Sequence, residues 1–223
     1  TGKTTSAVGG LGKSVVKTTA AFAGMASIAV GVRAAGQAVI GFDKNMRNVN
    51  SLAQLSEKDF RSLEKQVISL AGKTAQSPRT LADGLYDLVS SGFKGRDAMK
   101  VLKASARAAT AGLTTTEVAS GAVAGALNAY GLKARSASKV SDILFRTVDQ
   151  GVITFEQLAQ GIGPVLPVAR KLGVGLEQVG AMTATLTKAG IPAAEAFTYQ
   201  KGAMVALIKP TDELQKTFKK LGV

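Results

Sequence analysis

A glycine followed by a large apolar residue recurs along most of this chain, and this feature most limits the possible fold. The pairs are 17 to 22 residues apart. A glycine just past a helix end takes the left-handed conformation, and the next apolar residue packs back onto the last turn. Each pair therefore predicts the end of a helix. The pairs are Gly92-Phe93, Gly112-Leu113, Gly131-Leu132, Gly151-Val152, Gly173-Val174 and Gly190-Ile191.

Capping residues mark the expected helix starts between these stops. A hydroxyl side chain is followed three residues later by an acid or amide, which is the spacing of a capping box. The pairs are Ser56 with Asp59, Thr114 with Glu117, and Thr154 with Gln157. Ser77 before Pro78 adds a further cap. Apolar residues between the signals recur at helical spacing. We predict an all-α fold, with a compact array of about eight short helices over residues 56–223.

The first fifty residues differ from the rest in composition. Residues 1–14 are expected to be a flexible segment, and residues 15–50 a long helix rich in alanine and glycine. Residues 18–32 carry no charge but are shorter than the roughly 20 apolar residues that a membrane span needs. We therefore favour packing against sister helices in a homo-oligomer. The alternative is a membrane-active segment within residues 15–42.

Small residues indicate where helices approach closely. Gly24 and Gly31 lie in the long helix, and Gly121 and Gly125 lie one turn apart in a later one. Such spacing allows close helix contact. The four glycines are candidates for helix packing within the chain or for a seam between copies.

The sequence "GGLGKS" at residues 9–14 resembles the lysine end of a nucleotide-binding P-loop. The full pattern requires a glycine at position 7 and a preceding buried strand. Ala7 occupies that position, and residues 1–6 are polar and too few for a strand. We predict that this segment binds no nucleotide.

Composition excludes several kinds of chemistry and indicates the charge of a partner. The chain has no cysteine and no histidine, which removes thiol nucleophiles and imidazole bases. Most carboxylates lie at expected helix starts, so we predict neither an enzyme nor a cofactor or metal site. The net charge is +13, from 28 basic and 15 acidic residues. This charge favours an acidic partner: nucleic acid, an anionic membrane or an acidic protein surface.

Four basic residues form the candidate contact with such a surface. Arg96, Lys100, Lys103 and Arg107 are spaced by four, three and four residues, so they share one helix face. The alternative is an ordinary solvated face. No aromatic residues are interleaved for stacking on single-stranded nucleic acid.

Several longer segments carry a resemblance to a known family. They are "FDKNMRNVNSLA" at 42–53, "LADGLYDLVSSGF" at 81–93, "GALNAYGL" at 125–132, the stretch 154–191 and "LIKPTDELQKTFKKLGV" at 207–223. In this order and spacing the chain from 41 to 223 resembles the conserved core region of phage tail tape measure proteins. It departs at Gly175, where a Ser or Thr cap is expected, and at residues 197–199, where small residues are more usual.

The resemblance implies a structural role. Tape measure proteins are long helical chains that occupy the tail tube lumen, set tail length during assembly and leave ahead of the DNA during genome ejection. This chain would be one segment of such a protein, in the tail tube lumen or tail tip of the virion, and in the host cytoplasm during assembly. Its partners would be the tail tube and tail tip proteins and other copies of itself, and they could include the host membrane during ejection. Nucleic acid would be a partner only by proximity. The alternatives are a basic helical nucleic-acid-binding module and a pore-forming protein acting through residues 15–42.

Overall fold

The computed structural model describes residues 41–222, which are helical with no strand among them. Residues 41–53 form a helical stretch. The α-helices that follow are α2 (Glu57–Ala71), α3 (Pro78–Ser90), α4 (Gly95–Ala111), α5 (Thr116–Tyr130), α6 (Ala137–Gln150), α7 (Phe155–Ile162), α8 (Leu166–Lys171), α9 (Leu176–Lys188), α10 (Ala193–Ile208) and α11 (Asp212–Leu221), with a 3-10 turn η1 (Ala134–Ser136) before α6. The all-α prediction is confirmed. The sequence signals for the 1–14 segment, the nucleotide motif, Gly24 and Gly31 fall outside the described residues.

Residues from Asn45 onward form one compact unit, distinct from residues 1–44. Met46 and Val49 are fully buried, and the Asn45 side-chain amide donates a hydrogen bond to Asp83 on α3. The end of the expected long helix therefore contributes to the core of this unit.

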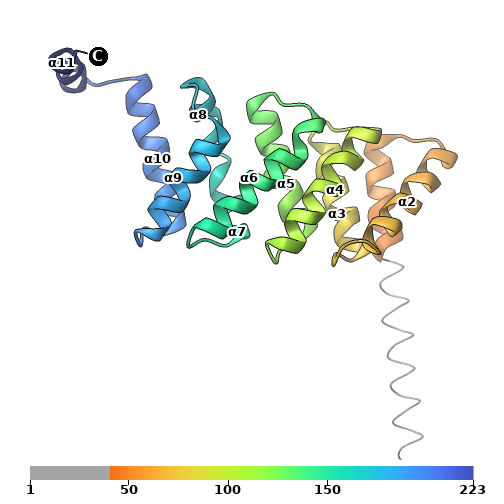
Figure 1. Cartoon of the computed structure of the whole chain (residues 1–223). Coiled ribbons are helices and arrows are strands. Elements are labelled where there is room, and N and C mark those ends of the chain that lie inside the picture. The colour runs from red at the N-terminus through yellow and green to blue at the C-terminus, as the bar shows by residue number, and fades with distance from the viewer. Residues whose placement is uncertain (1–40, 223) are drawn as a thin grey trace, which may run out of the picture. The chain divides into compact units, whose positions relative to one another are not determined.

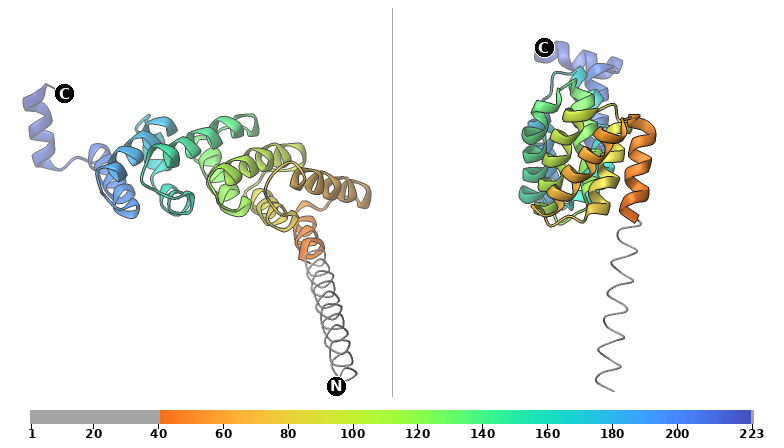
Figure 2. Two further views of the ribbon diagram at one scale, coloured as in Figure 1. Left: turned by 60° about the horizontal axis from the view of Figure 1, so that its bottom comes forward. Right: turned by 90° about the vertical axis from the view of Figure 1, so that its right-hand side faces the viewer.

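The helices of this unit pack in chain order. Every substantial helix contact joins elements that are at most three places apart, such as α3 with α5, α4 with α6 and α6 with α9. The colours of Figure 1 follow one another along the helices from α2 to α10, and the end-on view of Figure 2 shows them behind one another. Each helix is therefore held mainly by helices near it in the chain, as in repeat proteins, although these helices do not share a sequence repeat.

The predicted helix stops are confirmed at four glycines. Gly92, Gly131, Gly173 and Gly190 all have positive φ. At each of them the next residue donates its N–H to a carbonyl five residues back, for example Phe93 to Leu88 at 3.0 Å. This is the Schellman bond that closes a helix end.

The helix stop predicted at Gly112 is confirmed, since α4 ends at Ala111, but the glycine is not the left-handed residue. Gly112 has φ −86°, and Leu113 takes the left-handed conformation with φ 53°. A Cβ on residue 112 would lie 2.7 Å from Cδ2 of Phe155, so this glycine is required by packing. The following start shifts as well. Thr115 caps α5 by accepting the Val118 N–H, and Thr114, the predicted cap, is buried.

Helix α6 ends before Gly151 as predicted, but this glycine does not take the left-handed conformation. Its backbone is extended, with φ −106° and ψ 179°. A Cβ there would lie 2.9 Å from Oγ1 of Thr187 on α9 and 2.8 Å from the Thr147 carbonyl oxygen. The absent side chain lets the end of α6 approach α9 closely.

The other predicted caps are confirmed. The Ser56 and Ser77 hydroxyls accept the N–H groups of Asp59 and Thr80, each at 3.2 Å. Thr154 and Gln157 form a reciprocal capping box. Gly175, which has no capping hydroxyl, is compensated from the other side, because Gln178 Oε1 accepts its N–H at 2.7 Å.

Candidate interaction surface

The predicted basic face lies on α4 and is exposed. Its four members project from the side of the helix that flanks buried Met99 and Leu102. Alanines on the other side bring α4 close to α5 and α6. The local reason for the face is the three- and four-residue spacing of long basic side chains on an amphipathic helix. The members are Arg96, Lys100, Lys103 and Arg107.

The structure gives these four cations different surroundings. Lys100 Nζ lies 3.3 Å from Asp97 Oδ1 in an exposed pair within α4. Arg107 lines a cavity of about 230 Å³ between α4 and α6, whose wall includes Asp142 and Phe145. Arg96 and Lys103 line hollows on the other side of α4, facing α2. The face predicted from sequence is therefore divided, and its function remains a prediction.

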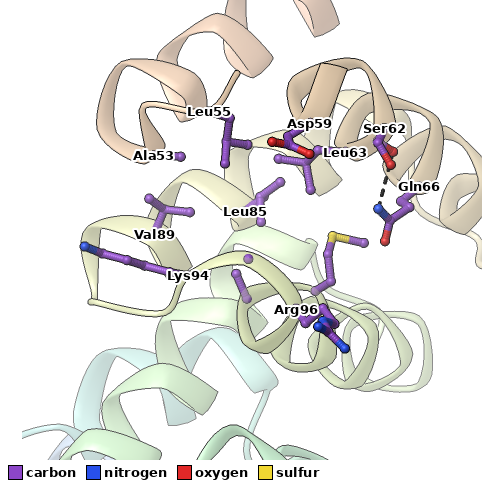
Figure 3. A pocket seen from close by; sticks show the side chains of 13 residues that line it. Ala53, Leu55, Asp59, Ser62, Leu63, Gln66, Leu85, Val89, Lys94 and Arg96 are labelled. Carbon is purple, nitrogen blue, oxygen red and sulfur yellow. Dashed lines mark hydrogen bonds between the residues drawn. The ribbon is translucent and has the colours of Figure 1, made fainter. Parts of the chain in front are cut away.

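Two hollows lie between α2 and α4. The first has a volume of about 320 Å³, and its lining includes Leu55, Leu63 and Val89. Figure 3 shows these side chains converging from the residues before α2, from α2 and from α3. The second, of about 270 Å³, is lined by Lys65, Lys73 and Lys103 among others. Sequence reasoning missed both, because they depend on the separation of two helices.

Several acidic residues of the described part have shifted pKa values. Burial raises the pKa of Asp83 and of Asp87 on α3, and the nearby Glu117 raises the Asp87 pKa further. On α9, a hydrogen bond from Lys139 lowers the pKa of Glu177, and their charged atoms lie 2.7 Å apart. Among residues 41–222, no group of three or more potential ligands is arranged to hold a metal ion.

The glycine candidates on α5 face open space. A Cβ on Gly121 or Gly125 would meet no atom within 4 Å. Neither glycine is used for packing inside the described part of the chain. A seam between copies remains a prediction for both. No helix among residues 41–222 is both long enough and apolar enough to cross a membrane.

Comparisons with known proteins extend over nearly the whole compact unit. Residues 64–223 match the family described as "Phage-related minor tail protein". The tape measure protein of Pneumococcus phage Dp-1 is 30% identical over 182 residues, which cover 82% of this chain and 16% of that protein. The probable tape measure protein of Clostridium phage phiCD119 is 27% identical over 69% of this chain and 17% of its own length.

A third relative is more distant, and no solved structure matches the chain. The probable tape measure protein of Escherichia phage P2 is 25% identical over 84% of this chain and 22% of its own length. The chain thus spans between 16 and 22% of the curated relatives that it matches.

Proposed function

Because this chain belongs to the phage-related minor tail protein family, a family of structural components of the phage tail, we propose that it is a segment of a tape measure protein. In this role it occupies the lumen of the tail tube or the tail tip. It helps to set tail length during assembly and leaves during genome ejection. The match over residues 64–223, which includes every helix from α3 onward, carries this proposal.

The composition of the core supports passage through a narrow tube. Among residues 41–222, sixteen of the forty-two buried apolar residues are alanine, and two are phenylalanine. Burying an alanine contributes about 2 kcal/mol less than burying a leucine, which has three more carbons, at about 0.8 kcal/mol per buried CH₂. A core built from such residues costs little to unfold, and a chain in transit has to unfold.

Charge supports residence beside an acidic wall. The net charge is +13, and only three ion pairs with both partners among the described residues bring opposite charges within 4 Å. Most basic side chains of residues 41–222 are exposed. An acidic tube wall would attract such a chain over about 8 Å at physiological salt.

Tail length tests the measuring role directly. Duplicating the codons for residues 15–50 in the phage gene adds 36 residues, or about 54 Å if they are helical, at 1.5 Å per residue. Electron microscopy of purified tails should show a longer tail, and synonymous recoding of the same stretch should leave the length unchanged. Unaltered length in the duplication would exclude a measuring role for this segment.

We further propose that the segment before the compact unit assembles as a parallel bundle of several copies. The Ala/Gly-rich stretch from residue 15 onward offers small apolar side chains that symmetric copies would bury against one another. Since Met46 and Val49 are buried within one chain, the bundle would end near residue 44. Cryo-electron microscopy of tails should resolve more than one chain in cross-section, and a single chain there would contradict the bundle.

The exposed basic face of α4 supports one competing function, binding to nucleic acid. Such binding would weaken steeply with salt, because each neutralised phosphate releases a counterion. Titrating the chain with duplex DNA at 50 and 200 mM salt distinguishes a tail component from a nucleic-acid-binding protein. A tail component is expected to bind DNA weakly at both concentrations, and submicromolar binding at 200 mM would favour the alternative.

A further inference from the structure

The two hollows between α2 and α4 adjoin each other, and together they are called the groove below. They share Ser62 and Gln66, whose side chains lie at the junction on the exposed side of α2. Helix α2 packs on α3 and makes no comparable contact with α4, so the space between α2 and α4 stays open. The groove extends along α2 from Asp59 to Leu70, about 17 Å at 1.5 Å per residue, and reaches Lys73 just past the end of the helix.

One half of the groove is apolar. Leu55 and Ala53, which precede α2, are half-buried, and Leu63, Val89 and Met99 line the hollow from α2, α3 and α4. Figure 3 shows Leu55, Leu63 and Val89 pointing toward the same space. An apolar hollow of this kind takes side chains such as leucine from a partner.

Basic residues border the groove along its length. Lys94 and Arg96 lie at the apolar half, and Lys65, Lys73 and Lys103 line the other half. All five side chains are exposed. The only acidic residue in either lining is Asp59, whose carboxylate accepts the Ser56 hydroxyl at 2.7 Å. The groove is therefore strongly positive, and a concave surface concentrates that field.

We propose that this groove binds an acidic amphipathic helix of another protein. Such a helix would place apolar side chains against Leu55, Leu63 and Met99, and its carboxylates beside Lys94, Arg96 and Lys103. A helix of about fourteen residues has the length of the groove. The inference goes beyond the proposed function, since it requires only the groove and not a position in the tail.

Other occupants fit the groove less well. A second copy of the chain carries the same charge of +13, so its approach to a positive groove is unfavourable. Nucleic acid would satisfy the cations but would leave the apolar half unfilled. The lining also contains no aromatic residue on which a base could stack.

The test uses the full 223-residue chain and a fluorescent 14-residue helical peptide with leucines on one face and glutamates on the other. We expect saturable binding by fluorescence anisotropy, with a Kd on the order of 10 μM. The same peptide with lysine in place of glutamate should not bind. Methyl NMR should show shifts at Leu55, Leu63 and Met99.

Two charge reversals locate the site. Arg96→Glu with Lys103→Glu should weaken peptide binding at least about 10-fold, because close interfacial charge pairs are lost and replaced by repulsion. Lys133→Glu with Arg135→Glu makes the same charge change at exposed positions outside the groove and should have little effect. All four positions are exposed, so circular dichroism should show unchanged melting. Ala53→Glu, which places a carboxylate in the apolar half, should also block binding.

Three outcomes would overturn the proposal. The first is no peptide binding at 100 μM to the wild-type chain. The second is equal loss in the groove variant and the matched control, which would indicate attraction by net charge alone. The third is displacement of the peptide by duplex DNA with comparable affinity, which would assign the groove to nucleic acid.

Discussion

The ring of Phe197 on α10 packs directly against the Cα of Gly161 on α7. A Cβ on residue 161 would lie 2.5 Å from Cε2 of the ring and closer still to Cδ2. Phe197 is 4% exposed and is one of two phenylalanines in the core of the described residues. Residues 197–199 depart from the small residues expected from the resemblance to tape measure proteins. The large ring of Phe197 fits here because Gly161 on the facing helix has no side chain.

This pairing predicts strong coupling between the two positions. Gly161→Ala should destabilise the fold by about 1–3 kcal/mol, because the added methyl forces the ring out of its place. With Phe197→Leu already present, the same change should cost much less. Chemical denaturation of the four proteins of the cycle measures the coupling. Gly202→Ala on α10, where a Cβ meets nothing within 4 Å, should instead stabilise slightly. Additive effects at residues 161 and 197 would contradict the packing argument.

Leu113 is a site where glycine should be better than the native residue. Its φ is 53° and its side chain is 93% exposed, so it is strained without gaining burial. Leu113→Gly should raise the free energy of unfolding by about 1 kcal/mol, since glycine adopts this conformation without steric cost. Thermal melting provides the measurement.

Leu132→Gly is the matched control for that change. Leu132 follows a glycine that already has positive φ, and it is 40% exposed, so its replacement should destabilise the chain. Gly112→Val should also destabilise, through collision with Phe155 rather than through φ. A lower melting temperature for Leu113→Gly would contradict the prediction, because it would show that the leucine side chain stabilises the fold despite its exposure.

Asp87 should destabilise the fold at neutral pH. Burial, and then the charges of Glu117 and Asp83, raise its pKa above the ordinary value of 3.8. A carboxyl whose pKa is higher in the folded chain than in the unfolded chain is unfavourable when ionised, and this penalty disappears as pH falls below the unfolded pKa. Asp87→Asn should therefore raise the melting temperature at pH 7 and have a much smaller effect near pH 3. Asp149→Asn, which removes a carboxylate at an exposed position on α6, is the matched control.

The glycine-rich segment at residues 9–14 should bind no nucleotide. Ala7 replaces the first glycine of the P-loop pattern, and no strand is predicted before it. Isothermal titration calorimetry with ATP and Mg²⁺ should give no heat of binding. Micromolar, magnesium-dependent binding that is lost in Lys13→Ala would refute this prediction.

Helix starts and stops were predictable where the deciding bonds are local. Ser77 and Thr154 cap the third backbone N–H that follows them, and Gly131 and Gly190 end helices through bonds within six residues. Such contacts depend on residues close in sequence, so a short pattern is sufficient to identify them. The spacing of the basic residues on α4 was readable for the same reason.

Long-range packing decided what sequence patterns did not reveal. Gly112 carries the same pattern as the other stops, but it packs against Phe155, forty-three residues later, and the left-handed conformation falls on Leu113. Gly161 gave no local signal at all, because its role depends on the ring of Phe197. The groove between α2 and α4 exists because both helices pack on α3 and not on each other. Sequence by itself determined the helical class, most helix limits and the charge, since these follow from composition and from neighbours along the chain. Tertiary structure alone decided which of the basic residues share a surface, because that surface depends on distances between helices that no local pattern encodes.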